Sequence, residues 1–398
     1  MTHEAASALT AVRVIDADGH YLEPPQGLAD YITPRYRDWA PHVVRRSDGT
    51  DWWEGRGWWD DNPTGGYRRA SGIVGLAGIG RWRDQNHTAY ESTGLNYLDA
   101  NHAAHDATAR LSVMTDEGID AAVLYPSQSL VWVRDRDYAE ALLRALNDWL
   151  GDWIGADRSR LYGVVHLGVV RDVSWACEEV RRCVDRYGFK AVCIRNTHAS
   201  EDARWWDTEF DPLWATCQDL DIAVGIHPVA GDTSYGASRY FGMAGRTPIQ
   251  LFLRTPFANP VDMMNVIGGL IGGGVLERFP RLRVAILESG GGWLVSFLER
   301  LDSRFEHVGN ALPTKLSLTP SDYFRRQCWI SFDPEEAALT LTAKWLGADR
   351  IIWGSDFPHP DAFFPGVLKM LEDNLTELPQ HDRDRILRAN AAELYGLR

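Results

Sequence analysis

The 398-residue sequence predicts an α/β fold, a (β/α)8 TIM barrel with an insertion after its first strand. Eight short runs rich in β-branched residues recur along the chain, and stretches with apolar residues at the helical period separate them. This alternation is typical of βαβ units and a parallel sheet. A doubly wound open sheet is the alternative, but no GxGxxG motif follows the first run.

The runs give the expected strands in chain order. They cover residues 12–16, 120–125, 162–167, 190–195, 222–227, 283–288, 328–333 and 350–355. Apolar stripes at the 3.6-residue period mark two of the helices between them. One stripe consists of Leu142, Leu146, Trp149, Leu150 and Trp153, and the other of Ala176, Val180, Cys183 and Val184. The second helix is expected to end at Gly188.

Residues 24–104 interrupt the alternation and differ in composition from the rest. They are rich in glycine and contain Trp39, Trp52, Trp53, Trp58, Trp59 and Trp82. Because structureless loops of this length are uncommon in compact domains, we expect an inserted lid or subdomain over the carboxyl end of the barrel. Its tryptophans either pack onto the barrel or a second subunit, or line a pocket for a flat apolar substrate. Residues 1–398 as a whole are expected to form one domain.

A second interruption follows the fifth expected strand and covers residues 228–282. Its first part, residues 231–260, is predicted as a loop because of its glycines, prolines and polar residues. The second part, residues 261–279, is predicted as a helix despite its glycines.

The composition argues against several classes of protein. The chain has 41 Lys and Arg against 55 Asp and Glu, a net charge of −14, whereas binding to a phosphate backbone needs a basic stripe. No apolar run approaches the ~20 residues of a membrane helix, and the first residues do not resemble a leader. Five scattered cysteines suit a reducing cytoplasm. We therefore expect a cytoplasmic protein that acts on a small molecule, without nucleic-acid or membrane partners.

Three of the expected strands end in side chains that can bind a metal ion. Asp18 and His20 follow the first strand at a spacing that points both to the same side, His227 ends the fifth, and Asp356 follows the eighth. Each alone has an ordinary alternative: a buried structural histidine, or an aspartate that caps a helix. Their joint occurrence at the carboxyl ends of strands predicts one divalent ion. Two Asp and two His suit Zn²⁺ best and also accept Mn²⁺ or Fe²⁺.

Five segments of the chain resemble a known family. They are IDADGHYLEP (15–24), IHP (226–228), FPRLRVAILESGGGWLVSFLERLD (279–302), IIWGSDFPHPD (351–361) and NAAELYGL (390–397). Together they resemble the amidohydrolase-2 branch of the amidohydrolase superfamily, which contains the aminocarboxymuconate semialdehyde decarboxylase-like enzymes. The resemblance runs from about residue 12 to the C-terminus and covers the 24–104 insert poorly.

The resemblance implies a metal-dependent barrel enzyme and a homodimer, which the tryptophan-rich insert and the acidic surface permit. Many members decarboxylate aromatic or dienoic acids without oxidation, and others hydrolyse or hydrate small carboxylates. Matched motif by motif, Asp18, His20, His227 and Asp356 are the implied metal ligands.

The chain departs from the family pattern at two strand ends. Superfamily members with two metals carry a carboxylated lysine after strand four, where this chain has Arg195, so one metal is expected. The decarboxylases usually carry a histidine after strand six, where this chain has Glu288. Glu288 is either a carboxyl kept neutral by its surroundings, a general base beside a metal-bound water, or a residue that orients a histidine ligand.

Five further residues are candidates for substrate contact. Arg195 can clamp a substrate carboxylate or pair with an internal acid, and Arg254 lies among aromatic residues of the loop after strand five. His166 faces either the substrate or the core, and Tyr125 ends the second strand. His359 follows the metal-binding Asp356 and fits a supporting role.

Non-oxidative decarboxylation of a small aromatic or unsaturated carboxylic acid is the leading hypothesis. Asp356 would carry a proton to the α-carbon, with His227 and Glu288 as the other catalytic candidates. The runner-up is a hydrolase that attacks a C–C, ester or amide bond with metal-bound hydroxide, where Asp356 or Glu288 takes the proton. A metal-independent lactonase and a non-enzymatic scaffold remain as weaker alternatives.

Overall fold

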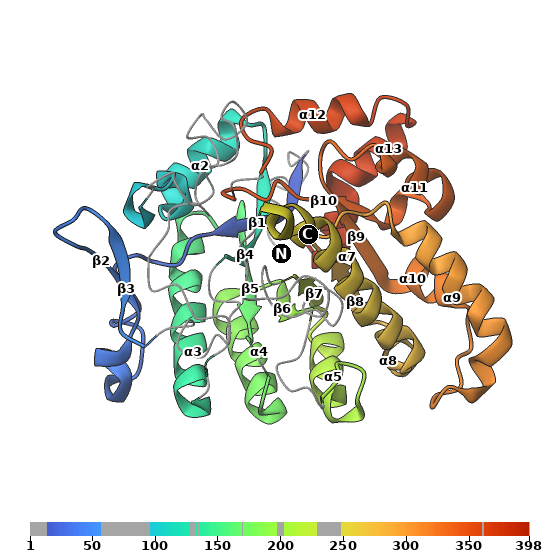
Figure 1. The fold of residues 1–398 in the computed structure, drawn as a ribbon, viewed down its shortest axis with the longest axis horizontal. Coiled ribbons are helices and arrows are strands. Elements are labelled where there is room, and N and C mark those ends of the chain that lie inside the picture. The colour runs from blue at the N-terminus through green and yellow to red at the C-terminus, as the bar shows by residue number, and fades with distance from the viewer. Residues whose placement is uncertain are drawn as a thin grey trace, which may run out of the picture.

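A computed structural model describes residues 14–56, 96–127, 133, 135–168, 170–196, 203–228, 248–359 and 362–397, without the side chains of 248–255. Eight parallel strands form a nearly closed barrel in the order β1-β4-β5-β6-β7-β8-β9-β10, so each strand pairs with the next along the chain (Figure 1). They are β1 (Ile15–Tyr21), β4 (Ala121–Pro126), β5 (Leu161–His166), β6 (Ala191–Arg195), β7 (Ala223–His227), β8 (Arg283–Ile286), β9 (Cys328–Phe332) and β10 (Ile351–Trp353). The predicted barrel is therefore confirmed.

Contacts just beyond the last strand close the barrel. The backbone N–H of His20 donates to the carbonyl of Phe357 (2.8 Å), and the N–H of Asp356 donates to the carbonyl of Asp18 (3.2 Å). A closed parallel sheet brings the carboxyl ends of all strands to one face. The closure thus places the end of β1 directly beside the segment that follows β10.

The barrel interior is filled by small and branched side chains and sealed by the end of the chain. Ala17, Val123, Ala191 and Ala285 belong to this inner core, together with Tyr395 from α14 (Asn390–Tyr395). The Tyr395 hydroxyl donates to the carbonyl of Ala17 (2.8 Å). In barrels with a packed interior, the polar side chains that carry chemistry lie at the carboxyl end of the strands.

Helices surround the barrel. They are α2 (Ala107–Asp116), α3 (Arg136–Trp153), α4 (Val173–Tyr187), α5 (Asp211–Asp219), α7 (Pro248–Gly272), α8 (Val275–Arg278), α9 (Leu294–Val308), α10 (Pro320–Gln327), α11 (Ala338–Leu346), α12 (Val367–Asn374) and α13 (Gln380–Asp384). The stripe predicted for 142–153 is buried in α3, and α4 ends at Gly188, which has a left-handed φ of 70°. No described helix has both the length and the apolar character needed to cross a membrane.

A buried carboxylate connects α3 to α4. Glu179 is fully buried and accepts hydrogen bonds from Arg182 (2.6 and 2.8 Å) and from Asn147 (3.0 Å). Arg144 of α3 donates to it as well (3.1 Å). Burial raises the pKa of Glu179, but these donors outweigh burial, and the pKa lies below its usual value of 4.5.

Replacing Glu179 by glutamine is expected to lower the free energy of unfolding by about 2 kcal/mol at pH 7, because charged hydrogen bonds between two helices are lost. A depressed folded-state pKa gives stability that is fully present above the unfolded pKa and is lost as pH falls through the folded one. The difference from wild type should therefore shrink below pH 4.5. Urea unfolding across pH measures it, with exposed Glu178→Gln as control; a constant difference at every pH contradicts the prediction.

Part of the 24–104 insert is described. It contains an antiparallel hairpin of β2 (His42–Arg45) and β3 (Asp51–Glu54), which lies at the left edge of Figure 1. Trp39 packs edge-on against Tyr138 of α3 with ring centroids 5.4 Å apart. This contact attaches the insert to the barrel, the first of the two predicted roles for its tryptophans. Residues 57–95, with Trp58, Trp59 and Trp82, lie outside the described residues, and a subdomain stays a prediction.

The prediction of a loop over residues 231–260 is wrong from residue 248 onward. Helix α7 begins at Pro248 and contains Pro256 and Pro260. Because proline removes one helical hydrogen bond, both prolines favour a loop when the sequence is considered alone. Beyond them the helix buries Met263, Ile267 and Ile271, and this packing outweighs the lost hydrogen bonds.

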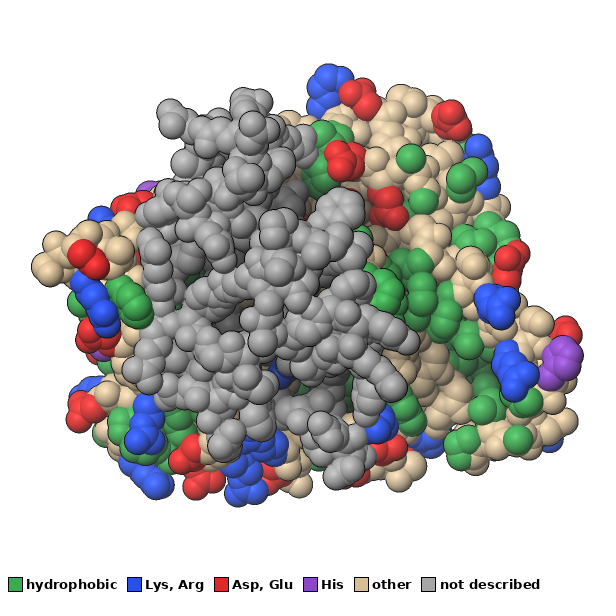
Figure 2. Space-filling model, in the orientation of Figure 1, with side chains coloured by type: hydrophobic (Ala, Val, Ile, Leu, Met, Phe, Trp, Pro, Cys, Tyr) green, Lys and Arg blue, Asp and Glu red, His purple; other side chains and the backbone are tan. Residues whose placement is uncertain are grey.

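In the coloured part of Figure 2, toward the edge of the molecule, acidic and basic side chains are interspersed. This part of the surface therefore carries charges of both signs.

Candidate metal centre

Two histidines face each other at the carboxyl end of the barrel. The Nδ1 atoms of His20 and His227 lie 3.2 Å from the carbonyl of Pro126 and 2.8 Å from that of Pro228. A carbonyl only accepts, so each Nδ1 carries a proton and each Nε2 of a neutral ring presents a lone pair. The two Nε2 atoms are 3.3 Å apart. Facing lone pairs at this distance repel each other unless a positive charge, a proton or a metal ion, lies between them.

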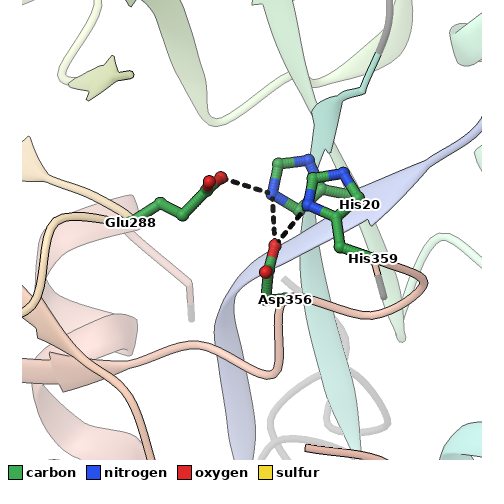
Figure 3. Close-up of side chains that lie close together, drawn as sticks. All are labelled: His20, Glu288, Asp356 and His359. Atoms are coloured by element: carbon green, nitrogen blue, oxygen red, sulfur yellow. Dashed lines mark ion pairs between the residues drawn. The ribbon is translucent and has the colours of Figure 1, made fainter. Parts of the chain in front are cut away.

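Three carboxylates surround the two imidazole nitrogens. Asp356 Oδ1 lies 3.3 Å and Glu288 Oε2 lies 3.6 Å from His20 Nε2. Dashed lines mark both contacts in Figure 3. Glu288 Oε2 is also 3.0 Å from His227 Nε2. Asp18 Oδ1 is 3.9 Å from each Nε2, is buried, and makes no hydrogen bond to the described residues. The fold therefore brings together all four predicted ligands and Glu288.

Unusual backbone geometry aims two of the carboxylates. Glu288 has a φ of 41° and Asp356 a φ of 55°, in the left-handed region that non-glycine residues rarely adopt. Glu288 lies two residues beyond β8, which ends at Ile286 and not at 288 as predicted. The side-chain amide of Asn259 on α7 donates to the Glu288 carbonyl (3.0 Å) and holds this turn. Strain of this kind clusters at functional sites.

A buried carboxylate, Asp16, and a buried guanidinium, Arg110, lie beneath the site and are not among the residues predicted from the sequence. Asp16 accepts hydrogen bonds from the N–H (2.9 Å) and the hydroxyl (2.5 Å) of Ser355. Arg110 of α2 donates to the His20 carbonyl (2.9 Å) and lies over the Phe357 ring. A Cβ at Gly19 would stand 2.8 Å from the Asp16 carboxylate and 2.9 Å from the Arg110 guanidinium, so a side chain there would displace one of these two groups. These contacts fix the end of β1 against the segment after β10.

The charges at the site shift each other's pKa. Burial raises the pKa of Asp18 to about 8 and lowers the pKa of His20 well below its ordinary value. Burial also opposes the charge on His227, but Glu288 and Asp18 outweigh it and raise the pKa of His227. His227 in turn outweighs burial at Glu288 and keeps the pKa of that carboxyl low. Without a metal ion, therefore, Glu288 and His227 stabilise each other as an ion pair.

His359 contacts both Asp356 and His20. Its Nδ1 lies 2.6 Å from Asp356 Oδ1, and its ring stacks on His20 with centroids 4.1 Å apart (Figure 3). Its Nε2 lies 3.0 Å from the Ser127 hydroxyl, which donates to the Tyr21 carbonyl (2.7 Å). His359 is therefore placed to orient Asp356, and substrate contact by His359 stays a prediction.

The other predicted substrate residues lie around this centre. Arg195 is buried, which lowers its pKa to about 10, and it is in register with His227 across β6 and β7. His166 is buried at the end of β5, where its backbone N–H donates to the side-chain oxygen of Asn147 (2.8 Å). Tyr125 lies in the barrel interior. The Arg254 side chain lies outside the described residues. Contact of all four with substrate stays a prediction.

The hydroxyl of Tyr125 lies 3.0 Å from that of Tyr395, and its ring is stacked near that of His227 with centroids 5.8 Å apart. This residue therefore supports a histidine of the metal centre from below.

The donor set fits one divalent cation. Two nitrogens with free lone pairs and three carboxylates converge, and more negative charge gathers there than a single proton neutralises. Donor atoms ~2.1 Å from one ion lie ~3 Å apart at a right angle and ~3.4 Å apart at the tetrahedral angle, close to most of the separations seen. Asp18, His20 and His227 form one group of possible ligands, and His20, Glu288, Asp356 and His359 form a second group around the same imidazole. The set Asp18, His20, His227 and Asp356 stays a prediction.

Comparison with known proteins identifies the family. The amidohydrolase family model matches residues 15–397, and the chain belongs to this family. It is 25% identical over 308 residues to 2-amino-3-carboxymuconate-6-semialdehyde decarboxylase of Dictyostelium discoideum, covering 75% of this chain and 79% of that one. It is also 25% identical over 300 residues to gamma-resorcylate decarboxylase of Polaromonas sp., covering 72% and 86%. The predicted family resemblance is confirmed.

Solved structures support the same fold. An amidohydrolase from Mycobacterium avium subsp. paratuberculosis superposes with a TM-score of 0.75 at 21% identity, over 98% of this chain and 99% of that one. A dihydroxybenzoic acid decarboxylase from Polaromonas sp., with bound manganese and the inhibitor 2-nitroresorcinol, gives a TM-score of 0.61 at 22% identity, over 72% and 85%.

Proposed function

We propose that this chain is a metal-dependent carboxy-lyase that decarboxylates a small aromatic or unsaturated carboxylic acid without oxidation. The observation that carries the proposal is the pair of Nε2 atoms 3.3 Å apart on His20 and His227, enclosed by carboxylates. Two curated relatives of the chain are named as decarboxylases, one of a resorcylate and one of a muconate semialdehyde. Membership of the amidohydrolase family supports metal-dependent chemistry at this site.

One divalent ion is expected per chain. When bound, it supplies a Lewis acid that fixes the substrate carboxylate and a neighbouring oxygen in one orientation. Two Asp and two His favour Zn²⁺, but the structure of the dihydroxybenzoic acid decarboxylase from Polaromonas sp. contains bound manganese, and Mn²⁺ is an equal candidate. Asp18, His20, His227 and Asp356 are the proposed ligands.

The chain's own residues account for the remaining steps. In decarboxylation the C–C bond to the carboxylate breaks, CO₂ leaves, and a proton takes its place on carbon. Asp356 is the proposed carrier of that proton, because its Oδ1 lies beside His20 Nε2 and is held by His359. The buried guanidinium of Arg195 is the proposed partner of the substrate's negative charge.

Replacing Arg195 by methionine is expected to raise KM by about 10- to 100-fold, since a hydrogen bond between charged groups contributes ~1.5–3 kcal/mol. The lysine variant should recover only part of this loss, because an ammonium cannot bind a carboxylate bidentately. Steady-state kinetics on the best substrate measure both. An unchanged KM for the methionine variant would assign Arg195 to internal pairing instead.

A hydrolase remains the second candidate, favoured by Glu288. Its Oε2 lies 3.0 Å from His227 Nε2, within reach of a water bound at the centre. A carboxylate in that position can act as a general base.

The test is a screen of hydroxybenzoates and dienoic acids with protein of measured metal content. Release of CO₂ without solvent ¹⁸O in the organic product supports decarboxylation, whereas ¹⁸O incorporation supports the hydrolase. Metal content by elemental mass spectrometry should be close to one ion per chain. Full activity after complete chelation would overturn the metal mechanism.

A cytoplasmic location, a homodimer and the lack of a nucleic-acid partner are further proposals. Five buried cysteines without disulfides support a reducing compartment.

A further inference from the structure

We infer that Glu288 is itself a metal ligand. The centre then offers three carboxylate oxygens and two imidazole nitrogens. These five ligands favour Mn²⁺ over Zn²⁺ more than Asp18, His20, His227 and Asp356 alone would. This inference rests on the metal site of the proposed function. It goes beyond that site because the motif carried over from the family assigns only Asp18, His20, His227 and Asp356.

The distances place Glu288 with the ligands. Its Oε2 lies 3.0 Å from His227 Nε2 and 3.6 Å from His20 Nε2, whereas Asp18 Oδ1 lies 3.9 Å from each. Glu288 is therefore closer to both imidazole nitrogens than Asp18, which the sequence predicts as a ligand. His20, Glu288, Asp356 and His359 all offer donor atoms within 4.8 Å of one another. An ion held by both imidazole nitrogens would lie within bonding reach of Glu288 after little movement.

The surroundings hold Glu288 in this position. Its φ of 41° lies in the left-handed region, as does the φ of 55° of Asp356, and both carboxylates point at His20 in Figure 3. Asn259 fixes the Glu288 carbonyl (3.0 Å). The Glu336 carboxylate accepts the N–H groups of Gly291 (3.0 Å) and Gly292 (2.8 Å), just after the turn. A Cβ at Gly291 would stand 2.0 Å from the Phe332 ring, so the turn cannot move toward β9.

The type and number of ligand atoms determine which ion binds more tightly. Hard oxygen donors and a coordination number above four suit Mn²⁺, whereas Zn²⁺ is well served by four ligands in a tetrahedron. A fifth, carboxylate ligand should therefore strengthen Mn²⁺ binding more than Zn²⁺ binding.

Competition binding with a fluorescent chelator tests the inference on the apo form of the full chain. For Glu288→Gln we expect Mn²⁺ affinity to fall by at least about 100-fold, beyond the 10- to 100-fold typical of residues that only orient ligands. The factor by which Zn²⁺ affinity falls should be at least tenfold smaller than the factor for Mn²⁺. Glu288→His, which restores the side chain usual in the decarboxylases, should shift the ratio further toward Zn²⁺. Exposed Glu306→Gln on α9 is the matched control and should bind both ions as wild type does.

A wild-type measurement keeps the test independent of how the variants fold. In a crystal structure of the Mn²⁺-loaded protein, Glu288 Oε2 should lie ~2.2 Å from the ion. An ion more than ~3.5 Å from that oxygen, or unchanged Mn²⁺ affinity in Glu288→Gln, overturns the inference. Failure of the acid screen with metal-loaded wild type would instead overturn decarboxylation, and it leaves these binding constants untouched.

Discussion

Replacing His227 by alanine is expected to abolish metal binding and to lower decarboxylation by at least about a thousandfold, because a direct ligand matters more than the 10- to 100-fold of a supporting residue. His227 Nε2 lies 3.0 Å from Glu288 and 3.3 Å from His20 Nε2. Its removal leaves the carboxylates of the centre without one of their two nitrogen partners. Metal content should fall well below one ion per chain in elemental mass spectrometry.

Thermal unfolding separates a lost ligand from a damaged fold. A metal ion at 100 times its Kd adds about 2.7 kcal/mol to the free energy of unfolding of a protein that binds it only when folded. Wild type should therefore gain stability on metal addition, and His227→Ala should not. The apo forms should differ much less. His307→Ala on the exposed face of α9 serves as control, and a His227→Ala variant that still gains stability from metal would exclude His227 as a ligand.

The strands and the ligands were predictable because each depends on the local chain. Strands buried on both faces appear as continuous apolar runs, and a parallel barrel collects their carboxyl ends at one face. Asp18, His20, His227 and Asp356 could thus be grouped from four separate positions. The lengths of β1 and β8 were less accurate, since a bulge between Asp16 and Gly19 and the left-handed turn at Glu288 follow from tertiary contacts.

The contacts that support the ligands could not be predicted from the sequence. Arg110, Asn259 and Glu336 lie on helices or loops far along the chain from the groups they hold, and nothing in their neighbourhood distinguishes them from surface residues. The same holds for the early start of α7, where packing outweighs two prolines. Sequence patterns indicate which side chains carry chemistry, whereas their orientation depends on partners brought together by the fold.

Replacing Asp356 by asparagine is expected to lower the rate constant for decarboxylation by about 10²- to 10⁴-fold at saturating metal, because an amide cannot carry the proton that replaces CO₂. The amide keeps the size of the side chain and one oxygen for the ion. His359 Nδ1, 2.6 Å from Asp356 Oδ1, would lose its carboxylate partner. Exposed Asp373→Asn, part of a surface pair with Lys369, is the control with no expected effect.

Isotope exchange isolates the proton transfer from the loss of CO₂. In D₂O, an enzyme that protonates the substrate carbon also exchanges hydrogen at the same carbon of the product, and NMR follows this exchange without any C–C cleavage. If Asp356 carries the proton, exchange and decarboxylation should decline by similar factors in Asp356→Asn. If exchange stays at the wild-type rate while decarboxylation declines, Asp356 binds the ion but does not carry the proton. The proton must then come from another group near the reacting carbon, and Glu288 and His359 are the nearest candidates because both approach the same imidazole of His20.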